Sequence, residues 1–343
     1  MKKEKSKRGT GKNKKPRPRL DDAESTIDPV YHALSRINGD VNKMTKSQLQ
    51  SELHLHGLKA DGVKEVLMKR LKTYFKREKL EYAQKLSDEK EQYYPYLIVI
   101  DFEATCMKNN PPDFLHEIIE FPAVLISTSS NKIIDEFHTY CKPTLNPVLS
   151  DFCTELTGIT QDQVETAPVF SDALQLFLNW LTKHELLISH KCAFVTDGCW
   201  DFSRFLNIQC HLSELQYPRW ARKWINLKKV FGNFYRLQRP SISSMLQNIG
   251  LQFEGRLHCG MDDTRNIAYI VVRMLEDGAK FQINERLNAG KVMSLTENEK
   301  ILLTGFEEPS GNECPQPKES IDKDILSEEL EKLHISKTKS TAS

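Results

Sequence analysis

The chain has 343 residues, of which 39% are hydrophobic and 28% charged. This length suits one large domain with a smaller module, and no stretch approaches the roughly 20 apolar residues of a membrane span, so we expect no membrane partner. The N-terminus has no apolar signal core, which predicts an intracellular protein. The eight cysteines are scattered singly, without a C-x-x-C pair, which argues against zinc ribbons and disulfide frameworks.

The charge of the chain is divided unevenly. Residues 1–80 hold 21 Lys and Arg against 10 Asp and Glu, whereas the remaining residues hold 27 against 37. A basic front is suited to attract a polyanion, and an acidic body is suited to hold cations.

The N-terminal segment 1–36 is predicted to be a basic, disordered tail. Residues 1–20 contain ten Lys and Arg and almost no apolar side chains, so they cannot bury enough surface to fold. Such a tail is either simply solvated or acts in nuclear localisation or nucleic-acid attraction.

Residues 37–80 are predicted to form a compact helical pair. Thr45 and Gln48 match a capping box, Gly57 can end the first helix, and a second helix begins near Gly62 with an apolar stripe of period 3.6. The run LQSELHLHGLKADGVKEVLMKRL resembles a SAP domain, a small nucleic-acid-binding module. The alternative is an ordinary helical hairpin with a solvated basic face. In the SAP interpretation, three basic residues of the second helix contact the RNA backbone: Arg70, Lys72 and Lys76.

After a charged linker at 81–94, residues 95–292 alternate apolar strands with amphipathic helices. Strands are expected at 96–102, 119–127, 133–141 and near 192–196, and helices at 170–183 and from about 201 and 262. This alternation predicts an α/β domain around a mixed sheet. Residues 293–343 are acidic and expected to be mostly disordered, with one short helix at 325–333.

Two acids stand where the first strand ends. Asp101 and Glu103 are two residues apart, so they share a face of the strand, where their charges repel each other. Divalent cations such as Mg²⁺ or Mn²⁺ would relieve this repulsion. The alternative is that these acids only cap the strand or pair with Arg.

The helix near 262 supplies a further acid. Asp263 lies four residues before Ile267 and therefore points inward with the buried face, whereas Asp262 points outward. His258 precedes Asp263 by five residues. A fourth acid comes from Asp201, four residues before Phe205 on a predicted helix, and Asp197 in the preceding turn is the alternative to Asp201.

These residues, in this order, resemble the DEDDh exonuclease family, whose members have an RNase H-like fold. DFEAT at 101–105 matches its first motif, the spacing from His258 to Asp263 its third, and LTGITQDQV at 156–164 a further common stretch. With the SAP-like module, the resemblance narrows to the 3′–5′ exoribonucleases that recognise the 3′ stem-loop of histone mRNA. The segments that carry it are HEIIEFP, LSDFC, FLNIQC and KWINLKK.

The carboxylates suit a two-metal hydrolysis of RNA from its 3′ end to nucleoside 5′-monophosphates. Two Mg²⁺ ions, with Mn²⁺ tolerated, would be bound by Asp101, Glu103, Asp201 and Asp263. Glu103 and His258 are the expected catalytic residues, with His258 as the general base.

Four residues are expected to contact the substrate. The family resemblance implies that Glu103 and the Ala104 backbone touch the terminal nucleotide, and His258 lies beside it. Trp200 either stacks on a base or belongs to the core, whereas we assign Phe102 to the core.

The same resemblance implies RNA partners, above all a stem-loop with a 3′ overhang, and further the histone stem-loop-binding protein and ribosomal particles. Ribosomal RNA 3′ ends and small interfering RNAs are further expected substrates. The expected locations are the cytoplasm, the nucleus and the nucleolus. Two alternatives stay open: a DNA 3′–5′ exonuclease, or a non-catalytic stem-loop-binding adaptor.

Overall fold

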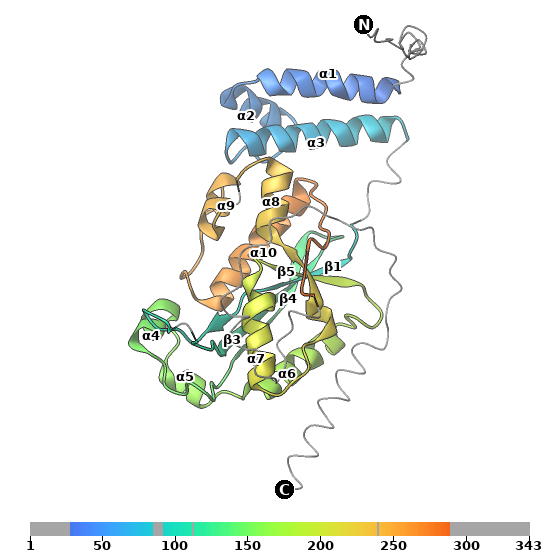
Figure 1. Cartoon of the computed structure of the whole chain (residues 1–343). Helices are drawn as coiled ribbons and strands as arrows, with labels where there is room; N and C mark the ends of the chain where they lie inside the picture. Colours follow the sequence, from blue (N-terminus) through green and yellow to red (C-terminus); the bar gives the residue numbers. More distant parts are fainter. Residues whose placement is uncertain (1–27, 85–91, 112, 239, 289–343) are drawn as a thin grey trace, which may run out of the picture.

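A computed structural model describes residues 28–84, 92–111, 113–238 and 240–288 (Figure 1). Residues 1–27 of the predicted tail and the whole acidic segment 293–343, with its expected short helix, lie outside the described residues. Within the described part of the chain, no helix is long and apolar enough to cross a membrane.

The N-terminal helices form a module with its own small core. They are α1 (Pro29–Lys43), α2 (Lys46–Leu55) and α3 (Lys64–Tyr82). The predicted capping box is confirmed, since Thr45 and Gln48 each accept a hydrogen bond from the other's backbone. The predicted extent of the tail was wrong at its end: residues 29–36 are helical, because Asp28 caps α1 and Pro29 suits its first position.

The sheet is mixed, as predicted. Its described strands are β1 (Tyr96–Ile100), β2 (Glu103–Ala104), β3 (Ile118–Ser127), β4 (Lys132–Tyr140), β5 (Cys192–Thr196), β6 (Lys223–Asn226) and β7 (Glu285–Arg286). The strand order is β2-β3-β1-β5-β6-β7, with β4 on β3. The pairs β1–β5 and β5–β6 are parallel, and the others are antiparallel. The four strands expected from alternating apolar residues are therefore present within two residues of their predicted ends.

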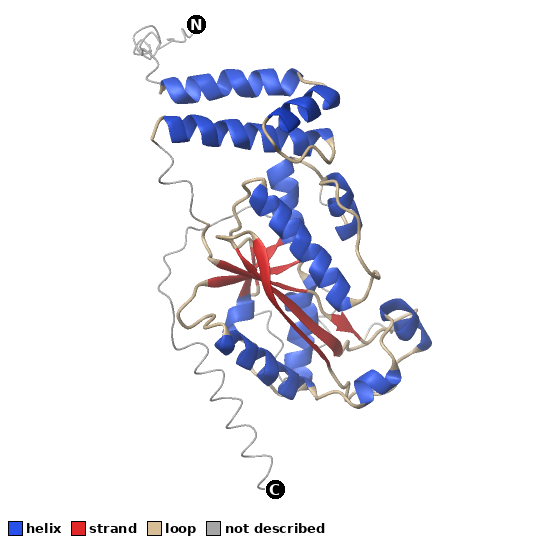
Figure 2. Cartoon of the chain, turned by 180° about the vertical axis from the view of Figure 1, so that it is seen from behind, coloured by secondary structure: helices blue, strands red, loops and turns tan. Residues whose placement is uncertain are grey.

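Helices cover both faces of the sheet (Figure 2). One face packs against α6 (Phe170–Lys183), the π-helix η1 (Asp201–Leu206) and α7 (Asn207–Leu212), and the other against α8 (Leu227–Tyr235), α9 (Ile242–Asn248) and α10 (Gly260–Glu276). Alternate residues of β1 serve the two cores: Ile98 and Ile100 the first, Leu97 and Val99 the second. Short helices α4 (Asp151–Thr157), α5 (Gln161–Glu165) and η2 (Arg219–Arg222) lie in the connections.

The N-terminal module is docked on the α/β domain rather than held apart by a linker. Helix α3 lies across the ends of α8 and α10 (Figure 1). Its Val66 is fully buried in the hydrophobic cluster of the second face, together with residues of α9 and α10. The predicted linker therefore does not hold the two parts apart, and Val66, which lies in the apolar stripe predicted for the second helix, belongs to the core of the larger domain.

Candidate active site

Four elements bring the predicted acids to one edge of the sheet. Asp101 follows β1, Glu103 lies in β2, Asp201 begins η1 just after β5, and Asp263 lies in the first turn of α10. Because β1 and β5 are parallel neighbours, their carboxyl ends lie at the same edge, which is where α/β folds place their ligands.

Asp201, rather than Asp197, is the acid that joins this cluster. Asp201 is only 5% exposed, and its Oδ1 accepts a hydrogen bond of 3.1 Å from the Phe102 backbone, between Asp101 and Glu103. Asp197 instead forms an ion pair of 2.7 Å with Lys228 of α8. The structure thus places Asp197 in the turn and in contact with a lysine, in accordance with our preference for Asp201.

Asp263 and His258 are held together by the backbone. The N–H of His258 donates a hydrogen bond of 2.7 Å to Oδ2 of Asp263, which is 4% exposed. His258 itself has a left-handed backbone with φ of 63°, and its side chain is exposed. Asp262 points away and accepts from the Arg256 backbone and pairs with Arg265. The inward and outward directions predicted for the two adjacent acids are confirmed.

Burial and repulsion from neighbouring carboxylates raise the pKa of all four acids. Burial, and then the negative charge of Asp201, raises the pKa of Asp101 well above its ordinary value, and burial and Asp263 do the same to the pKa of Glu103. Burial raises the pKa of both Asp201 and Asp263 to about 7. These carboxylates therefore resist ionisation in the absence of a cation.

The donor set fits divalent metal ions. One possible ligand atom from each of Glu103, His258 and Asp263 lies within 4.8 Å of the other two. Oδ1 of Asp263 is buried and has no hydrogen-bond partner in the part of the chain that the structure describes. A hard cation is the natural partner for such an oxygen beside further carboxylates.

Glu120 in β3 is a supporting residue that the sequence reasoning missed. It is 1% exposed, and its carboxylate accepts hydrogen bonds from the backbone N–H groups of Gly260 (2.9 Å) and Met261 (3.1 Å), and pairs with His138. A Cβ on Gly260 would lie 2.9 Å from Glu120, so glycine permits the approach. Glu120 thereby fixes the start of α10, which carries Asp263.

Glu117 organises the neighbouring loop in the same way. It is fully buried and accepts hydrogen bonds from three successive backbone N–H groups at residues 144–146. The available signal was the pair of acids in the otherwise apolar run HEIIEFP, which we used only as a family motif. Buried acids in a strand require such donors.

The aromatic residues beside the acids divide as follows. Phe102 is 4% exposed and packs on Phe121, which confirms its assignment to the core. Trp200 is 51% exposed, and the Arg204 guanidinium lies 4.8 Å from the centre of its ring. Trp200 is therefore outside the core, beside the first residue of η1. Ala104, the fourth expected contact, is buried in β2 next to Glu103.

The basic residues of α3 are not equivalent. Arg70 is 4% exposed and forms an ion pair with Asp277 of the α/β domain, so the expectation that it contacts RNA requires correction. Lys72 is half-buried, and its amino group contacts Asn42 of α1. Lys76 is exposed. The helical pattern alone could not distinguish these, because the partner of Arg70 lies 207 residues away.

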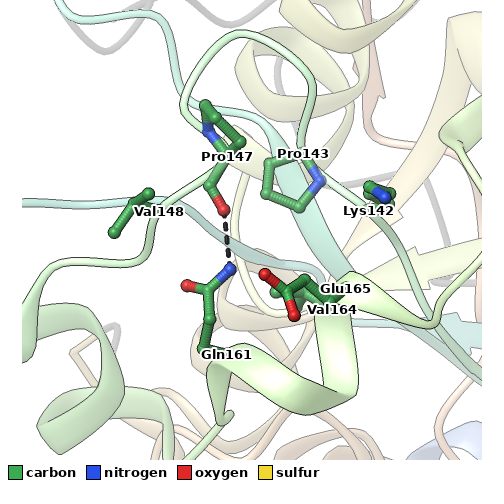
Figure 3. A pocket seen from close by; sticks show the side chains of 7 residues that line it. All are labelled: Lys142, Pro143, Pro147, Val148, Gln161, Val164 and Glu165. Carbon is green, nitrogen blue, oxygen red and sulfur yellow. Dashed lines mark hydrogen bonds between the residues drawn. The ribbon is translucent and has the colours of Figure 1, made fainter.

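A separate hollow lies between the loop after β4 and helix α5 (Figure 3). Gln161 closes one side by donating to the Pro147 carbonyl. Its lining residues are Lys142, Pro143, Pro147, Val148, Gln161, Val164 and Glu165. With Glu165 as its sole carboxylate, this lining offers no counterpart to the acidic cluster.

The arrangement of four acids and one histidine on this mixed sheet defines a nuclease of the DEDDh type. The sequence pattern of the Exonuclease family matches residues 98–271, and that of the SAP domain matches residues 40–76. The chain belongs to the Exonuclease family.

Within it, the chain is a 3′–5′ exoribonuclease of the ERI1 family. It is 49% identical to the human 3′-5′ exoribonuclease 1 over 276 residues, 80% of this chain and 78% of the relative, and 34% identical to the 3′-5′ exonuclease eri1 of Schizosaccharomyces pombe over 70% and 90%.

Solved structures agree with this assignment. One, described as "3′-end specific recognition of histone mRNA stem-loop by 3′-exonuclease", has 47% identity and a TM-score of 0.58, covering 79% of this chain and 94% of that one. A second, the nuclease domain of 3′hExo, "a DEDDh family member, bound to rAMP", has 52% identity and a TM-score of 0.56, covering 57% and 98%. The chain is thus a hydrolytic enzyme of a family that depends on divalent metals.

Proposed function

We propose that this exoribonuclease binds and trims the 3′ stem-loop of histone mRNA. The observation that carries the proposal is the union of an acidic site with a docked SAP module whose α3 is basic. The solved relative described as recognising that stem-loop supports it. The proposal extends to other RNAs with a duplex next to a 3′ end, namely ribosomal RNA 3′ ends and small interfering RNAs.

The proposed chemistry is hydrolysis that releases nucleoside 5′-monophosphates. Two Mg²⁺ ions would offset the charge of the scissile phosphate and lower the pKa of the attacking water, and Mn²⁺ would be tolerated in their place. Asp101, Glu103, Asp201 and Asp263 would hold these ions. His258 is exposed beside Asp263, and its ring can accept the proton of the water as general base.

The terminal nucleotide would lie between Glu103 and Trp200. The exposed indole of Trp200, supported by Arg204, provides a face on which a base can stack. The Ala104 backbone and Glu103 would contact the ribose, where a hydroxyl distinguishes RNA from DNA.

Digestion of a 5′-labelled stem-loop RNA with a 3′ overhang tests this function. In Mg²⁺ the label should appear in a ladder of fragments shortened from the 3′ end, with nucleoside 5′-monophosphates as product. A scrambled RNA of equal length, unable to pair, is the matched substrate. Equal kcat/KM on the two RNAs would refute the stem-loop proposal, while a ladder from DNA of comparable rate would favour the DNA alternative.

We further propose that the chain acts in the cytoplasm, nucleus and nucleolus, and that it meets its substrates as complexes with the histone stem-loop-binding protein and ribosomal particles. The ten Lys and Arg of residues 1–20 support nuclear targeting. Fluorescence microscopy of the chain with and without these residues tests it: equal distributions would refute a targeting role. Co-sedimentation with ribosomal particles and co-purification with the stem-loop-binding protein, each with and without RNase, test the partners.

A further inference from the structure

A buried ion pair joins the SAP module to the nuclease domain. Nε and Nη2 of Arg70 donate to the two carboxylate oxygens of Asp277, at 2.6 and 2.9 Å, and Nη1 donates to the carbonyls of Lys59 and Asp61. The Tyr235 hydroxyl donates to the same carboxylate at 2.8 Å. Both members of the pair are 4% exposed. Two parallel hydrogen bonds between planar groups fix direction as well as distance.

The backbones around this pair approach each other closely. The N–H of Val63 donates to the carbonyl of Asn248 at 2.8 Å. A Cβ on Gly250 would lie 2.3 Å from Cβ of Asp61, and Gly250 has a positive φ of 79°. Any other residue in place of Gly250 would push the two parts away from each other. The module is therefore seated in one orientation on the nuclease domain.

This orientation brings basic side chains of both domains together. The amino group of Lys69 lies 4.3 Å from the centre of the Phe234 ring in α8. Burial, then the charges of Lys76, Arg236 and Lys72, lowers the pKa of Lys69, so these three cations lie close enough to repel a charge on Lys69. Arg236, at the end of α8, is exposed. We call this set the bridging cluster: Lys69, Lys72, Lys76 and Arg236.

Helix α10 sets the distance between the active site and the ion pair on which the module is docked. Asp263 lies in its first turn and Asp277 caps its end, so 14 residues of helix separate the catalytic acid from the ion pair. At 1.5 Å per residue this is about 21 Å. At an axial rise of about 3.4 Å per base pair in a duplex, that distance corresponds to roughly six base pairs.

We propose that Arg70 and Asp277 are positioning residues: their ion pair holds the bridging cluster, a phosphate-binding site built from both domains, at a fixed distance from the active site. This inference rests on the proposed action on structured RNA and goes beyond it. It assigns Arg236 of the nuclease domain to the duplex-binding surface. In this proposal Arg70 holds the two domains together and does not contact RNA.

The test compares two substrates on the full-length protein: a stem-loop RNA with a 3′ overhang, and a single strand of about three nucleotides, which is too short to reach from the active site to the bridging cluster. Arg70→Gln and Asp277→Asn should each raise KM for the stem-loop at least about tenfold with kcat nearly constant, and should leave the short strand unchanged. The double variant should have the same KM for the stem-loop as either single variant, because all three variants remove the same ion pair.

Two results would contradict the positioning role of the Arg70–Asp277 ion pair. If Asp277→Asn matches the wild type while Arg70→Gln loses affinity, Arg70 contacts RNA directly. If both substrates lose activity in parallel, the pair is only structural. The wild-type preference for the stem-loop over the short strand is measured first; its absence would refute the proposed function instead.

Arg236→Gln provides a second test that does not disturb the buried pair. It should weaken stem-loop binding several-fold and reduce the slope of log affinity against log salt by about 0.7 to 0.9. The matched control is Lys43→Gln, a highly exposed lysine of α1 in the same module that pairs with Asp40 at the surface. Equal behaviour of the two variants would exclude Arg236 from the binding surface and overturn the proposal, even if the Arg70 variants do not fold.

Discussion

Replacing Asp201 with Asn should stabilise the metal-free protein while it abolishes hydrolysis. In the folded chain the burial of Asp201 raises its pKa from an ordinary 3.8 to about 7. Its ionised form is therefore costly unless a cation is bound. Asn keeps the oxygen that accepts from the Phe102 backbone but carries no charge.

The magnitude follows from proton linkage. One pKa unit is worth about 1.4 kcal/mol, so the rise to about 7 sets a ceiling of roughly 4 kcal/mol on the cost of the charge. Because Asp101 lies in the same cluster and shares protons with it, we expect a gain of about 2 kcal/mol. The folded state binds more protons than the unfolded state between pH 4 and 7, so the advantage of the variant is absent below about pH 4, grows as the pH rises to about 7 and is then constant.

Urea unfolding in EDTA across this pH range measures the difference, and repetition in Mg²⁺ should stabilise the wild type more than the variant. Asp135→Asn is a control of opposite sign. Although burial raises the pKa of Asp135, hydrogen bonding, chiefly with His184, lowers it below its ordinary value, so this variant should lose stability at neutral pH. The expected stabilisation is refuted if Asp201→Asn is no more stable than the wild type at pH 8 in EDTA, or if its advantage does not depend on pH. In either case the charge of Asp201 does not destabilise the metal-free protein.

Three further outcomes are expected. Asp101→Asn should abolish hydrolysis with the circular dichroism spectrum unchanged; activity within about threefold of wild type would refute the metal assignment. Asp263→Asn should reduce kcat far more than Asp262→Asn, because only Asp263 points into the cluster; equal losses would place the wrong acid at the site. Glu120→Gln should lower the free energy of unfolding by about 1 to 3 kcal/mol and slow turnover, since a charged cap of α10 is lost; unchanged kcat and urea midpoint would show that the cap does not position Asp263.

Much of the candidate site could be predicted because its residues are marked by conflict with their surroundings. Asp101 and Glu103 come directly after an apolar strand, and Asp263 is an acid on the buried face of a helix. The spacing of residues along the helix then distinguishes an inward-pointing acid from its outward-pointing neighbour, as it did for Asp263 and Asp262. Parallel pairing of the strands then predicts that these acids lie close together, because the carboxyl ends of neighbouring parallel strands lie at the same edge of the sheet even when the strands are far apart in the sequence.

The interface between the two domains could not be predicted in this way. A basic residue on an amphipathic helix gives the same pattern whether it faces solvent or a carboxylate far away in the sequence. Val66 likewise continues the stripe of Leu67 and Leu71 but packs on the nuclease core. Periodicity shows which residues share a face, whereas the partner of that face depends on tertiary contacts.

The choice of an ion pair for this interface is informative in itself. Burying two charges costs several kcal/mol in desolvation, and a well-packed apolar pair of the same volume often stabilises as much. Apolar contacts, however, are non-directional and would tolerate a rotated module. The Arg70 guanidinium, held by both oxygens of Asp277 and by two carbonyls of the loop before α3, accepts one orientation. In the proposed complex, this single orientation would set the distance from the basic helix α3 to the acidic site, which a non-directional apolar contact would not do.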